Sequence, residues 1–258
     1  MFVRRLFKIS DKLKWITLEL VIVFIGVYLA FLLQTFNESR KEQKEAEKVY
    51  TALKYELEYF RVKLPGMAVY SRNQRRDLRK IYREGNYNFF GNWRFIAPQY
   101  QYGIVEYASN LQNNNIIDFQ LYDELQDLYN FIQRLEHAES LIMEISQKYQ
   151  AIPDGLSKSS ETYQLRYADN MTNFNRYITF VADRANNLTM VARSAQRCLD
   201  VINPRLDAKK RKEIEAALIR QEIRDFGTIE EAVPEGLRMF PDFTEEEMKA
   251  LYEQGPVR

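Results

Sequence analysis

The chain has 258 residues and a formal net charge of +1, so no strong overall field points to nucleic acid or to acidic substrates. Nine glycines and seven prolines are few for this length, which favours long helices over a turn-rich β architecture. The single cysteine, Cys198, excludes an intrachain disulfide, and we interpret it as a small apolar helix residue.

A long apolar run, WITLELVIVFIGVYLAFLLQTF, occupies residues 15–36. As a helix it would be about 33 Å long, close to the ~30 Å hydrocarbon core of a bilayer. The run is longer than the apolar core of a signal peptide and more apolar around its circumference than a soluble core helix. The sequence therefore predicts one transmembrane helix with membrane lipid as a partner. Its anchor residues are Trp15, Glu19, Gly26, Ala30 and Phe36.

Two features inside this run have alternative interpretations. Glu19 is a candidate functional carboxylate, or it reaches the headgroup region from a shallow position. Gly26 and Ala30 form a small-xxx-small pair that would let two anchors pack closely. Residues 1–14 carry an excess of lysine and arginine, which places the N-terminus in the cytoplasm and residues 37–258 on the exported side.

Beyond the apolar run, apolar residues recur every three or four positions along most of the chain, as on one face of a helix. The first helix continues the anchor and ends at Pro65-Gly66, where the chain reverses into a shorter helix over 67–81. Further helices are expected over 118–149, 159–202 and 207–225. Residues 227–258 form a looser tail, in which Thr244 and Glu247 make a capping box for one last short helix.

The helix over 159–202 carries a heptad seam, the spacing that keeps one stripe against a partner helix. The seam pairs with a neighbouring helix of the same chain or with a second copy of the chain; the sequence leaves both open. Its positions are Met171, Phe174, Ile178, Val181, Ala185, Leu188, Ala192, Ala195, Leu199 and Ile202.

Residues 85–103 are rich in aromatic side chains and form an irregular connection. These side chains offer stacking surfaces for a ligand or partner, or they close the end of the bundle. The candidate binding residues are Tyr87, Phe89, Phe90, Trp93 and Phe95.

No catalytic grouping stands out. His137 is the only histidine and lies among charged residues on a predicted solvated helix face, so a histidine-rich metal site is excluded. No glycine-rich phosphate loop and no nucleophile elbow occur. We expect no catalytic residue, no metal, no cofactor and no enzyme activity.

Two stretches resemble an uncharacterised family of bacterial single-span inner-membrane proteins. The first contains Glu19, Gly26, Ala30 and the run Asn37 to Lys41, and the second runs from Tyr107 to Tyr129. The resemblance implies a bacterial inner-membrane setting, a single-pass anchor and a helical periplasmic region without an established activity. Asn113 to Asn115 replace a glycine that the family often has in the second stretch.

Together, these features predict an all-α protein: a basic segment (1–14), a transmembrane helix (15–36), an elongated antiparallel helical bundle or coiled coil (37–226) and a tail (227–258). The predicted function is a non-enzymatic, membrane-anchored interaction protein. It would act as a homo-oligomer or as an accessory subunit with other envelope membrane proteins, without nucleic acid. The alternative is an envelope sensor whose bundle binds a ligand in a polar pocket between helices and signals through the anchor.

Overall fold

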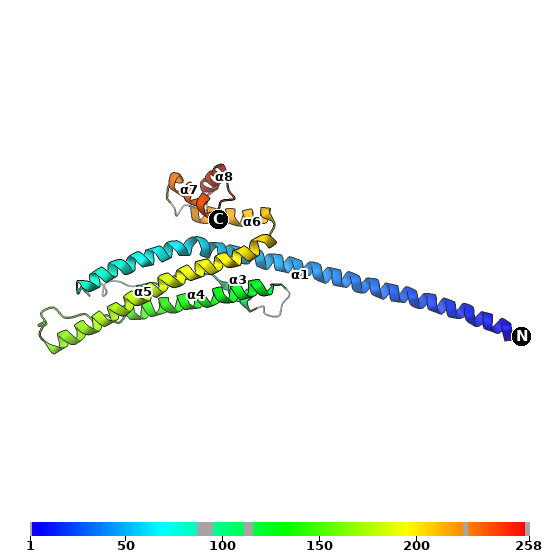
Figure 1. Ribbon diagram of the computed structural model, residues 1–258, viewed down its shortest axis with the longest axis horizontal. Coiled ribbons are helices and arrows are strands. Elements are labelled where there is room, and N and C mark those ends of the chain that lie inside the picture. Colours follow the sequence, from blue (N-terminus) through cyan, green and yellow to red (C-terminus); the bar gives the residue numbers. More distant parts are fainter. Residues whose placement is uncertain (1, 87–94, 111–115, 224–226, 256–258) are drawn as a thin grey trace. The chain divides into compact units, whose positions relative to one another are not determined.

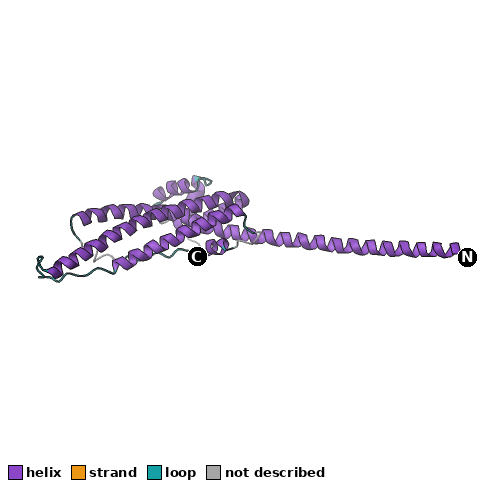
Figure 2. Ribbon diagram, turned by 60° about the horizontal axis from the view of Figure 1, so that its bottom comes forward, coloured by secondary structure: helices purple, strands orange, loops and turns teal. Residues whose placement is uncertain are grey.

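The computed structural model describes the backbone of residues 2–86, 95–110, 116–223 and 227–255, and the side chains in these ranges except for residues 2–14, 16–18 and 20–22. The chain divides into two units, Met1–Lys48 and Val49–Arg258. Every element in the described ranges is helical (Figures 1 and 2). In chain order they are α1 (Phe2–Arg83), α3 (Gly103–Ser109), α4 (Phe119–Ser146), α5 (Glu161–Ile202), the 3-10 turn η1 (Asn203–Arg205), α6 (Ala208–Glu222), α7 (Ile229–Met239) and α8 (Glu245–Gln254).

The all-α class is confirmed, but the predicted transmembrane helix over 15–36 is not supported. No helix holds a membrane-spanning apolar stretch among the residues whose side chains are described. Residues 16–18 and 20–22 of the predicted anchor lie outside them. The continuous described part runs from Val23 to Phe36 and would be about 21 Å long, shorter than the ~30 Å hydrocarbon core. The fold class is corrected on this point.

The predicted chain reversal at Pro65-Gly66 is also wrong, because α1 continues through Pro65 to Arg83. A proline inside a helix removes one backbone hydrogen bond and crowds the carbonyl four residues earlier, at a cost of about 3 kcal/mol. Packing outweighs this cost. Leu64 and Ala68 are buried on either side of the proline, whereas the proline itself faces solvent.

In the second unit, α1, α4 and α5 form a three-helix bundle (Figures 1 and 2). Ser71 of α1 bonds Arg184 of α5, whereas the earlier Lys54 bonds the later Asn203, so the two helices run antiparallel. Helices α4 and α5 are also antiparallel. Glu139 of α4 bonds Arg184 of α5, whereas the earlier Glu124 bonds the later Arg197. The structure thus has an antiparallel helical bundle, as predicted.

The heptad seam of α5 lies inside this bundle. Nine of its ten positions are buried within the single chain, and Met171 at its start is half-buried. Leu78 of α1 and Ile142 of α4 meet Phe174 and Ile178 of the seam in one apolar cluster. Of the two pairings that the sequence left open, the structure shows the one within the chain.

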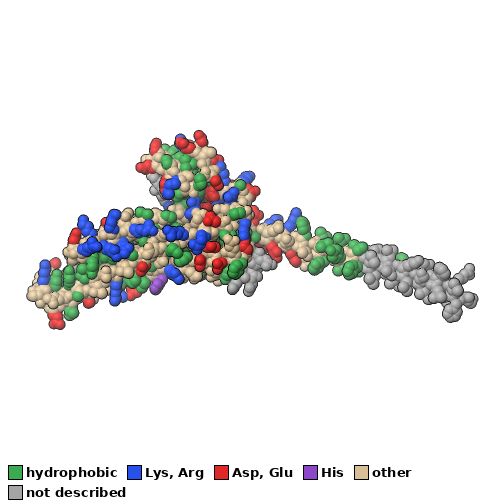
Figure 3. Space-filling view, in the orientation of Figure 1, with side chains coloured by type: hydrophobic (Ala, Val, Ile, Leu, Met, Phe, Trp, Pro, Cys, Tyr) green, Lys and Arg blue, Asp and Glu red, His purple; other side chains and the backbone are tan. Residues whose placement is uncertain are grey.

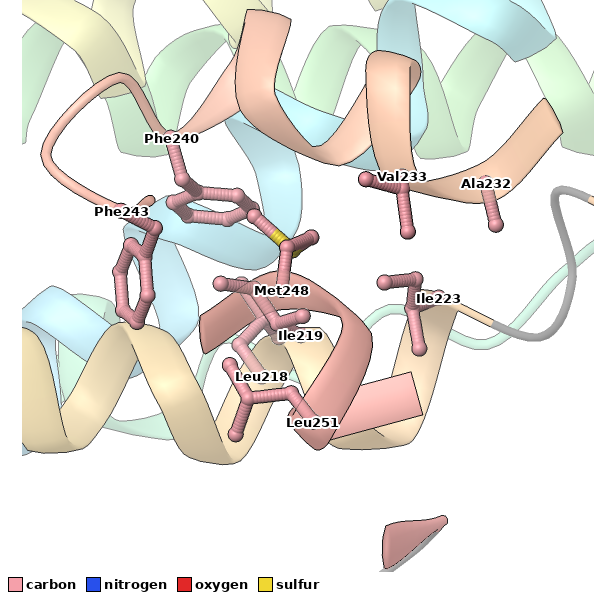
Figure 4. Packing of buried hydrophobic residues seen from close by; sticks show 9 residues of the cluster. All are labelled: Leu218, Ile219, Ile223, Ala232, Val233, Phe240, Phe243, Met248 and Leu251. Carbon is pink, nitrogen blue, oxygen red and sulfur yellow. The ribbon is translucent and has the colours of Figure 1, made fainter. Parts of the chain in front are cut away.

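A second apolar cluster joins α6, α7 and α8 into a C-terminal lobe, residues 208–254 (Figure 4). Asp207 caps α6, and the predicted capping box of Thr244 and Glu247 opens α8. A side chain at Gly236 would collide with Met248, so glycine allows α7 and α8 to approach closely. For the tail, residues 227–258, the sequence indicated only one short helix. The second one, α7, was obscured by Pro234 and Gly236, which lie inside it.

Candidate functional site

A polar cleft of about 270 Å³ lies between α1, α6 and the segment that precedes α3. The cleft is lined by a mixture of hydrogen-bond donors and acceptors, including two tyrosines. These residues are Tyr55, Glu56, Tyr59 and Lys63 of α1, Gln99 and Gln101 of the connecting segment, and Gln221 and Glu222 of α6. The cleft is the kind of polar pocket between helices that the sensor hypothesis requires.

Glu56 fixes one wall of the cleft. Its carboxylate accepts the backbone N–H groups of Ile104 and Val105 at 3.2 and 3.1 Å, and so satisfies donors at the start of α3. Burial raises the pKa of this carboxyl above its usual range, although the two backbone bonds oppose the shift. The connecting segment is therefore tied to α1 where the cleft opens.

The opposite wall comes from the end of α6. Lys63 pairs with Glu222, and the Tyr55 hydroxyl donates to the side-chain oxygen of Gln221 at 2.6 Å. Gln99 and Gln101 are exposed, and their amides bond no other side chain in the described part of the chain. These two amides and the hydroxyl of Tyr59 bond no other described side chain and remain available to a ligand.

The aromatic connection is only partly described. Tyr87, Phe89, Phe90 and Trp93 lie outside the described residues. Phe95 is half-buried; it packs against the cluster formed by α1, α4 and α5, and the guanidinium of Arg184 lies 5.3 Å from its ring centre. For this residue, the structure shows the packing alternative.

Next to Phe95, a buried polar network links α1, α4 and α5. Arg184 donates to Glu139 at 2.6 Å and to the Ser71 hydroxyl at 2.5 Å, and Tyr100 donates to the same carboxylate at 2.7 Å. Burial raises the pKa of Glu139, and the bonds from Arg184 and Tyr100 act against that shift. Glu139 is one of the charged residues around His137, which the sequence placed on a solvated helix face. Its partner Arg184 lies 45 residues further along the chain, so no short-range pattern in the sequence indicates this pair.

A second buried cation, Lys54, joins α1 to the end of α5 and to α6. Its ammonium lies 2.9 Å from Glu58, 2.9 Å from the side-chain oxygen of Asn203 and 2.6 Å from Glu215. The side chain is 0% exposed. All three donors of the ammonium are satisfied, which is what a buried charge requires. The sequence did not reveal this site, because a lysine at position 54 is compatible with the ordinary apolar spacing of the helix.

The first unit carries a band of exposed apolar side chains, which we call the apolar band, residues 23–36 of α1. Its large side chains are between 45% (Leu32) and 71% (Phe24) exposed. They cover the helix beside the grey segment in Figure 3. Of the predicted anchor residues, Trp15, Glu19 and Phe36 are exposed, and nothing lies within 4 Å of a Cβ built on Gly26.

Cys198 is buried in α5, and burial raises the pKa of its thiol to about 12. Because the thiolate is the reactive form, we expect no reaction with an aromatic disulfide reagent at pH 8 in the folded protein. One equivalent should react once the chain is unfolded in guanidinium. Rapid labelling of the folded chain would contradict the buried position of this residue.

No three histidine, cysteine, aspartate or glutamate side chains gather as metal ligands within the described ranges. His137, the only histidine, is exposed on α4. No protein-family model, no curated protein and no solved structure matches this chain. The resemblance to a family of single-span proteins therefore stays a prediction.

Proposed function

We propose that the protein is a non-enzymatic helical interaction protein that self-associates through the apolar band of α1. The observation that carries this proposal is the exposure of large apolar side chains over residues 23–36. Successive residues such as Phe31, Leu32 and Leu33 point about 100° apart around a helix, so the band is apolar on every side. A helix that is apolar on every side is normally covered by other structure. Large exposed apolar patches therefore mark interaction sites.

Two features favour other copies of the chain as the cover. Gly26 and Ala30 lie four residues apart and leave a flat strip on which a second helix can pack closely. The segment that follows, residues 37–48, contains four acids and four bases. Because these charges cancel, two copies whose apolar bands pack side by side do not repel each other over residues 37–48.

Cysteine scanning tests this contact. Single cysteines are placed one by one at positions 23–36 in a Cys198→Ala background, and the full chain is oxidised in intact cells. We expect disulfide-linked dimers with maxima every three to four positions, including 26 and 30, because one helix face meets its counterpart. A cysteine replacing the exposed Arg193 of α5 serves as the control. Monomers at every band position would refute the proposal.

Bulky substitutions provide a second readout. Gly26→Ile with Ala30→Ile should abolish most of the crosslinking through a reporter cysteine elsewhere in the band, because the close approach is lost. Leu29→Ile keeps the side-chain volume and should leave the yield unchanged. Equal yields from both variants would show that the small residues are not at the contact.

The polar cleft supports a second candidate function, the binding of a small polar ligand by the bundle. A thermal-shift series with amino acids and monosaccharides is expected to raise the unfolding temperature of the full chain with one of these classes. Gln101→Leu should remove the shift, whereas Gln147→Leu, an exposed glutamine outside the cleft, should keep it. No shift with any compound at millimolar concentration would count against this candidate.

A further inference from the structure

The end of α1 carries a dense stripe of cations, which we call the basic stripe: Arg72, Arg75, Arg76, Arg79, Lys80 and Arg83. At about 100° per residue these six side chains fall within a sector of about 140°, with Asp77 and Glu84 at its border. They line a shallow hollow of about 600 Å³. In Figure 3 blue side chains gather on this part of α1.

The stripe is poorly compensated within the described part of the chain. Arg76 meets Asp77 at 3.6 Å in an exposed pair, and Arg72 donates to the Thr189 hydroxyl at 2.6 Å. The buried Nε of Arg75 has no hydrogen-bond partner. Like charges three and four residues apart destabilise a helix, so an anionic partner would relieve this repulsion.

The opposite charge gathers on α7 and α8. Residues 228–254 contain eight acids and two bases. Three of the acids are paired, Glu235 with Arg238, Glu245 with Lys249 and Glu247 with Lys212. Asp242, Glu246 and Glu253 are exposed and bond no described cation.

Helix dipoles explain only part of this separation of charge. Lys80 and Arg83 lie in the last turn of α1, and Glu245 and Glu246 lie in the first turn of α8, where each is favourable. Arg72 and Arg76, however, lie well before the end of α1. Glu253 stands in the last turn of α8, where an acid is unfavourable. Interaction with the helix dipoles therefore does not account for these residues.

We propose that the basic stripe of one copy binds the acidic face of α8 in a second copy. The lengths agree: the stripe rises about 16 Å along α1, and the ten residues of α8 span about 15 Å. Arg76 and Arg83 are seven residues apart, as are Glu246 and Glu253, so each pair lies on one helix face. Such a contact joins different surfaces of two copies and extends head to tail.

Carbodiimide crosslinking of the full chain tests the contact, using an equimolar mixture of ¹⁴N- and ¹⁵N-labelled protein at low ionic strength. We expect peptide pairs that join Lys80 to residues 228–254 with one label on each side, since the reagent links an amine to a carboxylate in contact. The yield should fall about tenfold in 0.3 M NaCl, because salt screens exposed charges. If both peptides of every crosslinked pair carried the same label, the contact would lie inside one chain and the proposal would be overturned.

Charge reversal provides the decisive control. Arg76→Glu with Arg83→Glu should lower the mixed-label yield about tenfold, and so should Glu246→Lys with Glu253→Lys. A mixture of these two variants should restore it, because the charges are complementary again. Lys158→Glu with Arg176→Glu changes the net charge equally at exposed sites elsewhere and should have no effect. Failure of the mixture to restore the yield would overturn the proposal.

This contact is independent of the apolar band. Gly26→Ile with Ala30→Ile should abolish the band crosslinks and leave the Lys80 crosslinks intact, whereas charge reversal should do the opposite. If either variant lost both the band crosslinks and the Lys80 crosslinks, the two contacts would not be separate. That result would overturn the assignment of the Lys80 contact to charge.

Discussion

Replacing Lys54 with methionine is expected to lower the free energy of unfolding by about 3–5 kcal/mol. Methionine keeps most of the side-chain volume, so the loss comes from charge rather than from a cavity. The ammonium bonds Glu58, Asn203 and Glu215 in a site that excludes water. Without it, Glu215 loses the cation that pairs with it and Glu58 keeps only Arg61, so both carboxylates lose part of the compensation for their lost hydration.

Denaturant unfolding followed by circular dichroism measures this loss. Lys148→Met is the matched control, because Lys148 also pairs with a glutamate four residues away, at 2.6 Å, but on a solvated surface. Exposed pairs of this kind contribute little, so its unfolding midpoint should stay near that of the parent chain. Similar midpoints for the two variants would mean that Lys54 is hydrated and not buried.

Replacing Arg184 with methionine is expected to have an effect of similar size, about 3–5 kcal/mol. The guanidinium holds the buried Glu139 carboxylate and the Ser71 hydroxyl, and it lies over the ring of Phe95. Its removal leaves a carboxylate in the centre of the bundle with only Tyr100 as a donor. Arg193→Met, an exposed position on the same helix, should change stability little.

A second substitution separates the charge from the packing. Adding Glu139→Gln to Arg184→Met removes the stranded negative charge while keeping an acceptor for Tyr100. The double variant should therefore recover at least about half of the lost stability, a non-additive result typical of residues in one network. Additive losses in the double-mutant cycle would show that the carboxylate and the guanidinium do not act together.

Much of the fold was predictable from local patterns. Spacing of apolar residues located α4, α5 and α6 to within a few residues, and Ser160, Asp207 and Thr244 cap helices close to where the sequence places their starts. Such signals are readable because caps and stripes depend on residues only three or four positions apart. The helix through Pro65 was not predictable, since the burial of Leu64 and Ala68 that outweighs the proline depends on distant helices.

The sites were less predictable than the helices. The polar cleft combines side chains of α1, α6 and the connecting segment, and no short motif joins residues 55, 101 and 221. Lys54, Glu139 and Arg184 look like ordinary surface charges in the sequence. They are internal only because their partners arrive from helices up to 161 positions away.

By itself, the amino-acid sequence determined that this chain is helical, where most of its helices begin and end, and that a run of apolar residues precedes the bundle. The tertiary structure alone decided that the α5 seam is covered within one chain and which charges are buried. The reason is physical. Helix formation depends on neighbours one turn away, whereas burial and charge pairing depend on residues that only the packing of separate helices brings together.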